Sequence, residues 1–87
     1  MRFRVIFTED SVEQFSNLPK SVQILLKSAI KERLEADPLS YGKPLKYSWR
    51  GHRSLRVSDY RIIYRVDKQQ IIVLIIKIDI RRDVYEG

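Results

Sequence analysis

The chain has 87 residues, with 17 Lys and Arg against 11 Asp and Glu, which gives a formal net charge of +6. This length predicts one domain spanning residues 1–87, because domains usually contain about 100–150 residues. The absence of cysteine excludes disulfides, thiolate metal sites and a cysteine nucleophile. The longest apolar run, residues 71–76, is far shorter than the ~18 residues that span a bilayer, and early charges interrupt any signal peptide. We therefore expect a small cytoplasmic protein with no membrane contact.

The net positive charge of the chain comes entirely from its second half. Bases and acids cancel over residues 1–42, whereas residues 43–87 hold eleven bases and five acids and carry the whole excess. A charge divided in this way predicts one face that binds a polyanion. The alternative is an exposed face whose charges form only loose surface ion pairs.

The first half predicts a strand followed by two helices. Residues 2–7 begin with polar and apolar side chains in alternation and are rich in β-formers, which is typical of a strand. Thr8 is a favourable N-cap for a short helix that Asn17 can end. Pro19 suits the first turn of a second helix that runs to about Ala36. The apolar face of this second helix comprises Val22, Leu25, Leu26, Ala29, Ile30 and Leu34.

The second half predicts a loop and then a sheet. Proline and glycine mark a loop over residues 39–51. After it the apolar period changes to two, and residues 52–57, 60–66 and 71–78 are predicted to form three strands joined by short turns. The apolar run within the third strand predicts a central strand covered on both faces, and residues 81–85 are a candidate last strand. The order β-α-α-β-β-β, with or without that last strand, predicts an α+β fold. It is a small twisted, mainly antiparallel sheet with an N-terminal αα-hairpin packed on one face.

The residues do not support catalysis by a metal, a serine triad or a phosphate loop. The acids of the basic half are scattered over turns, and the chain has a single histidine, so no three-ligand site is apparent. No G-x-S-x-G motif is present, and three isolated glycines cannot form a nucleotide-binding loop. We expect neither a metal nor a small-molecule cofactor.

Arginines dominate the strands of the basic half. Arg53, Arg56, Arg61 and Arg65 fall on two strands that are predicted to pair, and every Lys or Arg in residues 50–66 is an arginine. The guanidinium fork suits bidentate phosphate binding better than an ammonium group does. Residue parity alone does not place these arginines on one face, because Arg53 and Arg61 are odd and Arg56 is even. The cluster as a whole favours anion binding, with a solvated sheet face as the alternative.

Aromatic residues alternate with these bases. Trp49, Tyr60 and Tyr64 each precede an arginine, and Tyr85 follows the pair Arg81-Arg82. Rings beside cationic forks suit single-stranded RNA, whose unstacked bases lie on the rings while arginines hold the phosphates. The alternative for Tyr60 and Tyr64 is core packing, since both have the same parity on one strand.

Two motifs carry a resemblance to a known family. Residues 55–66, with the sequence LRVSDYRIIYRV, resemble the strand–turn–strand signature of the RelE/ParE toxin superfamily. The apolar strand 71–78 and the ending Arg81-Arg82-Asp83-Val84-Tyr85 are similar to that family's closing strand and tail. The resemblance implies a RelE-like toxin of a type II toxin–antitoxin pair. Its implied partner is a cognate RelB-like antitoxin that wraps the sheet and helices and covers the basic face.

The RelE branch cleaves translated mRNA on the ribosome without a metal, so the resemblance also implies the ribosome and mRNA as partners. In that reaction a ribose 2′-OH attacks the adjacent phosphodiester and leaves a 2′,3′-cyclic phosphate. By resemblance Arg61 binds the phosphate, Arg81 stabilises the transition state or helps to protonate the leaving group, and Tyr85 stacks on a base or transfers a proton. His52 is the candidate general base, with a surface position at a strand edge as its alternative. The further expected RNA-binding residues are Arg53, Arg56, Lys46, Arg50 and Arg82.

One departure from the family pattern keeps other functions open. Asp79-Ile80 stand where many relatives carry Gly-His, so the tail supplies no histidine. One alternative is a ParE-like poison of DNA gyrase without nuclease activity. The other is an inactive toxin-like subunit of a repressor complex.

Overall fold

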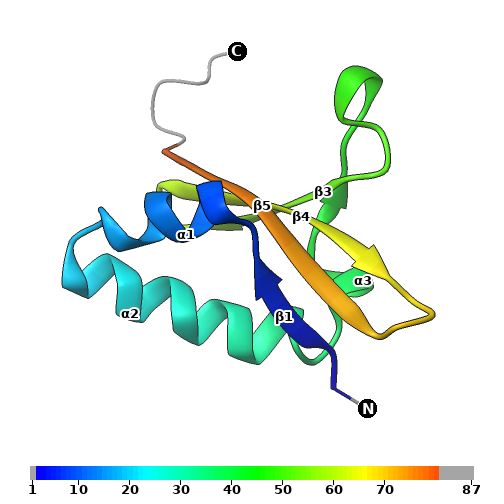
Figure 1. Cartoon of the computed structure of the whole chain (residues 1–87), viewed down its shortest axis with the longest axis horizontal. Coiled ribbons are helices and arrows are strands. Elements are labelled where there is room, and N and C mark those ends of the chain that lie inside the picture. The colour runs from blue at the N-terminus through cyan, green and yellow to red at the C-terminus, as the bar shows by residue number, and fades with distance from the viewer. Residues whose placement is uncertain (1, 81–87) are drawn as a thin grey trace.

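A computed structural model of the chain describes residues 2–80 (Figure 1). The strand predicted over residues 81–85 lies outside the described residues. The described elements are β1 (Arg4–Phe7), α1 (Glu9–Ser16), α2 (Lys20–Ala29), the π-helix η1 (Ile30–Leu34), α3 (Pro38–Tyr41), β2 (Lys43–Pro44), the 3₁₀ turn η2 (Tyr47–Trp49), β3 (Arg53–Val57), β4 (Tyr60–Asp67) and β5 (Ile72–Ile80).

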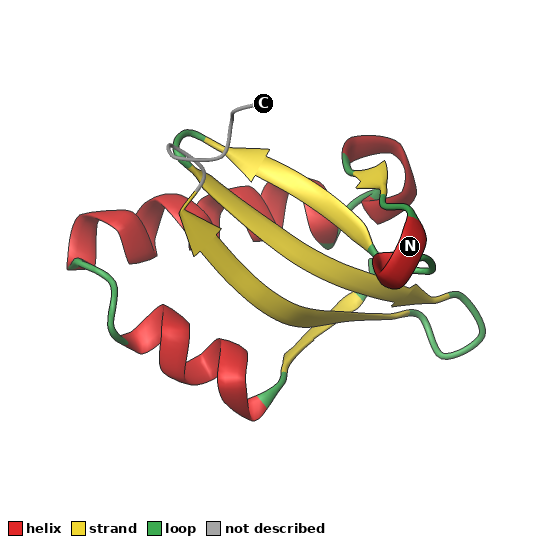
Figure 2. Ribbon diagram, turned by 90° about the horizontal axis from the view of Figure 1, so that it is seen from above, coloured by secondary structure: helices red, strands yellow, loops and turns green. Residues whose placement is uncertain are grey.

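The strands form one mixed sheet in the order β1-β5-β4-β3-β2 (Figure 2). β1 runs parallel to β5, and the other neighbouring strands are antiparallel. The predicted α+β class with a mainly antiparallel sheet is therefore confirmed. The first strand joins the sheet beside the last described one, so β5 lies between β1 and β4.

One face of the sheet carries the hydrophobic core. Leu26 and Ala29 of α2 belong to this core, and Phe15 of α1 packs against it. Both helices of the predicted αα-hairpin therefore cover the same face. Leu25 departs from the prediction, because its side chain is 43% exposed while Leu26 is fully buried. Successive helical residues are turned by about 100°, so Leu26 takes the centre of the buried stripe and Leu25 lies outside it. The buried core comprises Leu26, Ala29, Ile30, Leu34, Leu55, Val57, Ile62, Tyr64, Val73, Ile75 and Ile78.

The helices begin and end close to their predicted positions. The Thr8 side chain caps α1 by accepting a hydrogen bond from the Ser11 N–H at 3.2 Å, as its sequence position predicts. Pro19 is the N-cap of α2 and therefore lies just outside the first turn in which it was expected. α2 continues without a break into η1, which ends at Leu34, close to the predicted end near Ala36.

The predicted loop over residues 39–51 contains more structure than expected. It includes part of α3, the short strand β2 and the turn η2. Pro38 occupies the first position of α3, where a proline lacks only an N–H that the helix leaves unpaired in any case. β2 pairs with β3 through two residues and forms the far edge of the sheet. The paired residues lie nine and eleven positions apart, too far for the signal of a short turn to reveal the pairing.

β5 contains an irregularity that changes which side chains reach each face. Ile63 lies opposite Lys77 and Tyr64 lies opposite Ile75, so Ile76 is an extra residue in β5. β5 is a central strand as predicted, but Leu74 and Ile76 are only partly buried. The expected cover on both faces is therefore wrong, because the two helices pack on the same side of the sheet. None of the helices in residues 2–80 has the length and apolar character needed to cross a membrane.

Candidate anion-binding site

Two arginines lie directly opposite each other near the end of the β3–β4 hairpin. The hairpin turns at Ser58-Asp59, and its register pairs Arg56 with Arg61. Directly paired residues point to the same face of a sheet, with Cβ atoms about 4.5–5.5 Å apart. Residues paired across a two-residue turn have opposite parity, so an even and an odd arginine share one face. The parity that left the arrangement open in the sequence therefore places Arg56 and Arg61 together.

The arginine pair lines a cleft of about 500 Å³. Lys43 joins it because β2 pairs with β3, and Arg33 joins it from η1. These four bases are the only charged groups among the described residues that line the cleft. The cleft therefore presents a concentrated positive charge, which favours an anion. Its lining comprises Arg33, Tyr41, Lys43, Pro44, Leu45, Ser54, Leu55, Arg56 and Arg61.

Arg61 keeps hydrogen-bonding capacity despite a nearby carboxylate. Its Nη2 atom lies 3.8 Å from Oδ2 of Asp79, whose Oδ1 atom lies 3.7 Å from Nζ of Lys77. These distances exceed hydrogen-bond length, so the pairs are loose. The Nε atom of Arg61 is buried and has no hydrogen-bond partner among residues 2–80. The Arg61 side chain is 30% exposed and its terminal nitrogens make only this loose ion pair within the described residues, so those nitrogens stay available to a ligand.

His52 lies away from the cleft. It precedes β3, four residues from Arg56, which corresponds to about 13 Å along an extended strand. Its ring packs edge-on against Trp49, with ring centroids 5.1 Å apart. Within the described part of the chain its Nδ1 atom is buried without a hydrogen-bond partner. The structure therefore does not bring the candidate base together with Arg61.

Arg53 also points away from the arginine pair. It is opposite Tyr64 in the register, on the face of the sheet that carries the core. Its Nη2 atom donates to the carbonyl oxygens of Leu39 at 2.8 Å and Gly42 at 2.7 Å. The Nη2 atom of Arg53 is therefore occupied by backbone carbonyl groups, and the expected contact of Arg53 with phosphate stays a prediction.

The other expected RNA-binding residues lie apart from the cleft or outside the described part. Lys46 and Arg50 flank η2, in the exposed segment that projects beyond the start of β3 (Figure 1). Arg81, Arg82 and Tyr85 lie outside the described residues. Ile80, the last described residue, is paired with Tyr60, the neighbour of Arg61.

The aromatic residues of the hairpin serve the core. Tyr64 is fully buried and Tyr60 packs against the core cluster, which confirms the packing alternative for both. Trp49 is 36% exposed.

Sequence reasoning missed several residues of the cleft. Arg33 belongs to the half of the chain whose charges cancel, and only helix packing places it beside β3. Tyr41 and Lys43 lie in the predicted loop and reach the cleft through the β2–β3 pairing. The sequence contains a signal only for Arg56 and Arg61. A two-residue turn at Ser58-Asp59 pairs them directly and so places both on one face of the sheet.

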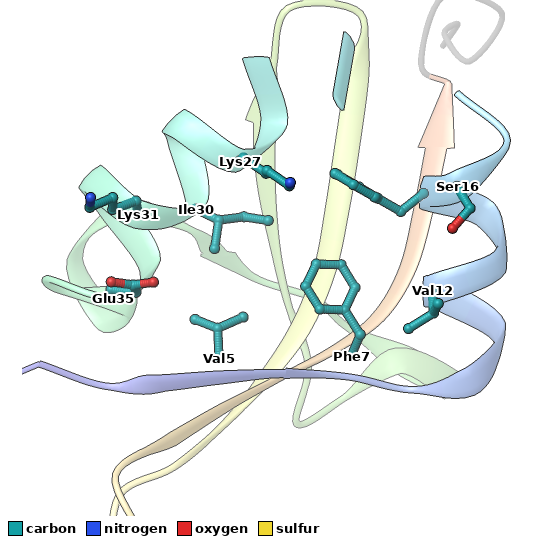
Figure 3. A pocket seen from close by; sticks show the side chains of 9 residues that line it. Val5, Phe7, Val12, Ser16, Lys27, Ile30, Lys31 and Glu35 are labelled. Atoms are coloured by element: carbon teal, nitrogen blue, oxygen red, sulfur yellow. The ribbon is translucent and has the colours of Figure 1, made fainter. Parts of the chain in front are cut away.

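A second hollow, apolar and separate from the cleft, opens between β1, α1 and α2. It measures about 400 Å³ (Figure 3). Val5 and Phe7 point into it from β1, and Val12 borders it from α1 (Figure 3). β1 is an edge strand, so its outer side has no strand partner in the described sheet. We call this feature the β1 groove; its lining comprises Val5, Phe7, Val12, Phe15, Ser16, Lys27, Ile30, Lys31 and Glu35.

Together, the fold and the cleft define a small α+β protein with an αα-hairpin on one face of its sheet and a cationic site on a β-hairpin. Residues 5–85 match the family described as ParE toxin of type II toxin–antitoxin system, parDE. Toxin RelG of Mycobacterium tuberculosis is 32% identical over 85 residues, which cover 98% of each chain. The chain therefore belongs to the RelE/ParE superfamily and is a toxin of the type II toxin–antitoxin class.

Solved structures show the same fold. The toxin–antitoxin complex RelBE2 from Mycobacterium tuberculosis contains a chain that matches with a TM-score of 0.88 and 30% identity, over 93% of both chains. The isolated RelE toxin of E. coli matches with a TM-score of 0.76 over 92% of this chain and 85% of that one. At 21% identity, this second likeness concerns the fold alone.

Proposed function

We propose that this toxin is an endoribonuclease that cleaves translated mRNA on the ribosome. The observation that supports this most is the directly opposed pair Arg56 and Arg61 in a cleft with two further bases. Like charges directly opposite each other destabilise a sheet, and an anion between them removes that cost. A phosphate of RNA has the charge and the acceptor oxygens that two guanidinium forks can bind.

The proposed reaction uses a nucleophile supplied by the RNA itself. The ribose 2′-oxygen bonds to phosphorus while the bond from phosphorus to the 5′-oxygen breaks, which yields a 2′,3′-cyclic phosphate and a 5′-hydroxyl end. The 2′-OH loses a proton, the 5′-oxygen gains one, and negative charge grows on the phosphoryl oxygens. In this proposal Arg56 and Arg61 stabilise that charge. Arg81 and Tyr85 stay in the roles that the family resemblance implies for them.

The test is cleavage by matched arginine variants. Arg61→Ala is expected to lower the rate of mRNA cleavage about 10²–10³-fold, because it removes a donor to the charge that develops in the transition state. Purified toxin is added to a translating extract, and primer extension maps the cuts in a reporter mRNA. Arg65→Ala is the control, because it removes the same charge from the exposed end of the same strand, outside the cleft.

Arg81→Ala and Tyr85→Phe are measured beside these variants to test the tail. Equal rates for Arg61→Ala and Arg65→Ala would refute the assignment of the phosphate site to the cleft. A wild-type protein that gives no cut in translated mRNA would refute the nuclease itself.

We also propose that a RelB-like antitoxin inhibits this toxin by binding the β1 groove with an extended apolar segment. The match of this chain to one chain of a solved toxin–antitoxin complex supports such a partner. The groove offers Val12, which is 48% exposed, and the unpaired edge of β1, to which an extended segment can add as a strand.

A second function, poisoning of DNA gyrase, is favoured by the match of residues 5–85 to the ParE toxin family. The two functions predict different products. Gyrase-dependent breaks in plasmid DNA, together with intact mRNA in the translating extract, would select the gyrase poison. Cut mRNA without DNA breaks would select the nuclease.

A further inference from the structure

The cross-strand pair Arg53 and Tyr64 holds the segment that forms one wall of the cleft. Arg53 donates to the carbonyl oxygens of Leu39 and Gly42, at 2.8 and 2.7 Å. The hydroxyl of Tyr64, opposite Arg53 in the register, donates to the carbonyl oxygen of Pro38 at 2.7 Å. Two neighbouring side chains of the sheet thus bind three carbonyl groups of a single short segment.

That segment has little internal support. α3 has four residues, and its backbone hydrogen bonds to the carbonyl of Asp37 are long, at 3.2 Å from Ser40 and 3.4 Å from Tyr41. The last carbonyl groups of any helix lack helical partners. Side chains that donate to these carbonyl groups therefore contribute much of what fixes α3 against the sheet.

The packing around Gly42 leaves no space for movement toward the sheet. Gly42 is buried, and a Cβ atom there would overlap the Tyr64 hydroxyl and lie 2.8 Å from the ring atom Cζ. Burial raises the pKa of Tyr64, partly offset by Arg53, so the phenol keeps the proton that it donates. The backbone at Gly42 is therefore fixed by close contact as well as by hydrogen bonds.

The residues on either side of Gly42 belong to the cleft. Tyr41 precedes it and Lys43 follows it, and both line the cleft that holds Arg56 and Arg61. β2 contributes only two pairs to the sheet, Lys43 with Ser54 and Pro44 with Arg53. So short a strand adds little to hold Lys43 in place, and the contacts of Arg53 and Tyr64 fix the backbone just before it.

We propose that Arg53 and Tyr64 are positioning residues of the RNA site, which set the location of Lys43 relative to the opposed arginines without touching RNA themselves. This proposal rests on the proposed function, because it assigns RNA phosphate to the cleft. It gives a role to Arg53, which faces the core side of the sheet, whereas Arg56 of the same strand faces the cleft.

The test is a double-mutant cycle between the positioning pair and Lys43. Tyr64→Phe removes one hydroxyl, changes no charge and is expected to weaken RNA binding about three- to tenfold. In a Lys43→Ala background the same substitution is expected to weaken RNA binding much less, because the Lys43 ammonium group that it would displace is already absent. The probe is a short single-stranded RNA made uncleavable by 2′-O-methyl groups, and its Kd is measured by fluorescence anisotropy at fixed salt with the full chain.

Two further measurements keep the result interpretable. Arg53→Lys conserves the positive charge, so a loss of affinity in that variant cannot come from net charge. It also replaces Tyr64→Phe if the latter fails to fold. Amide hydrogen exchange of the peptide over residues 39–45 reports the position of the segment without RNA, and it is expected to accelerate in both variants.

The outcomes separate this proposal from the function on which it rests. Equal losses of affinity with and without Lys43, or unchanged exchange in residues 39–45, overturn the positioning role while RNA binding by the wild type stands. A wild type that binds no RNA probe and cuts no mRNA overturns the proposed function, and this role with it. Faster exchange together with a loss that depends on Lys43 supports the proposal.

Discussion

Gly42 illustrates how one missing side chain decides local structure. Its φ is −84°, which any residue can adopt, so backbone conformation does not require glycine here. The requirement comes from Tyr64, whose hydroxyl and ring occupy the space that a Cβ atom would need. A single hydrogen atom at Gly42 thus allows the Tyr64 hydroxyl to reach the carbonyl group of Pro38.

Gly42→Ala is expected to lower the free energy of unfolding by about 1–3 kcal/mol, because the added methyl group overpacks a buried contact. Urea denaturation followed by circular dichroism measures this loss. In a Tyr64→Phe background the loss from Gly42→Ala should be smaller, because the hydroxyl that the methyl group overlaps is absent. An equal loss in both backgrounds would show that Tyr64 is not the source of the strain.

Among the elements, α1 continues the hydrogen bonding of β5 beyond the end of β1. The carbonyl oxygen of Ile75 accepts from the N–H of Thr8 at 3.1 Å and from the Ser11 hydroxyl at 3.0 Å. The N–H of Ile78 donates to Oε1 of Gln14 at 2.8 Å. β1 ends at Phe7, opposite Ile75, so α1 and its N-cap supply partners to backbone atoms of β5 where β1 stops.

The irregularity in β5 matters to the site because it determines on which face of the sheet the side chains beyond Ile76 lie. With Ile76 as the extra residue, Asp79 pairs with Arg61 and Lys77 pairs with Ile63. The carboxylate of Asp79 therefore lies beside Arg61 and near Lys77.

Gln14→Met, which conserves side-chain size, is expected to cost about 1–3 kcal/mol of unfolding free energy, because it leaves the Ile78 N–H without its partner. Chemical denaturation measures the cost, and hydrogen exchange at the Ile78 amide should accelerate. Gln69→Met is the control, since Gln69 is exposed in the β4–β5 turn. Similar small effects for both substitutions would mean that another group or water replaces Gln14.

At the scale of the whole molecule, two different surfaces flank the sheet. The cationic cleft lies at the β3–β4 hairpin and the edge strand β2, and the apolar β1 groove lies at the opposite edge. One surface suits a polyanion and the other suits an apolar partner segment. In the strand order only β5 lies between β1 and the strands that carry the cleft, but the two surfaces share no lining residue, so we expect a substitution in one surface to leave the proposed binding at the other intact.

Val12→Asp is expected to weaken antitoxin binding on the order of 10–100-fold, because it puts a carboxylate where an apolar side chain of the antitoxin is proposed to pack. Cleavage of mRNA should be unchanged, since Val12 lies outside the cleft. Calorimetric titration with the cognate antitoxin measures the binding. Ile24→Asp is the matched control, because Ile24 is 67% exposed on the same αα-hairpin but does not line the groove. Equal weakening by both variants would refute the groove as the docking site.

The secondary-structure elements and the fold class follow from local signals in the sequence. Apolar periodicity located both main helices and the three long strands, because burial on one face of a helix or strand leaves a local pattern. The N-cap at Thr8 and the turn at Ser58-Asp59 were equally local signals. The RelE/ParE resemblance named the superfamily from residues 55–66 and the chain's last residues, and the comparisons confirmed it.

The composition of the cleft depends on tertiary contacts that local sequence does not encode. Arg33 and Lys43 reach Arg56 through helix packing and through a two-residue strand pairing, and neither contact has a signature in the local sequence. Arg53 and His52 have the residue types of a phosphate ligand and a base, yet register and packing direct them elsewhere. The +6 charge of the chain predicted a basic face, and strand pairing and helix packing determine which of its bases line one cleft.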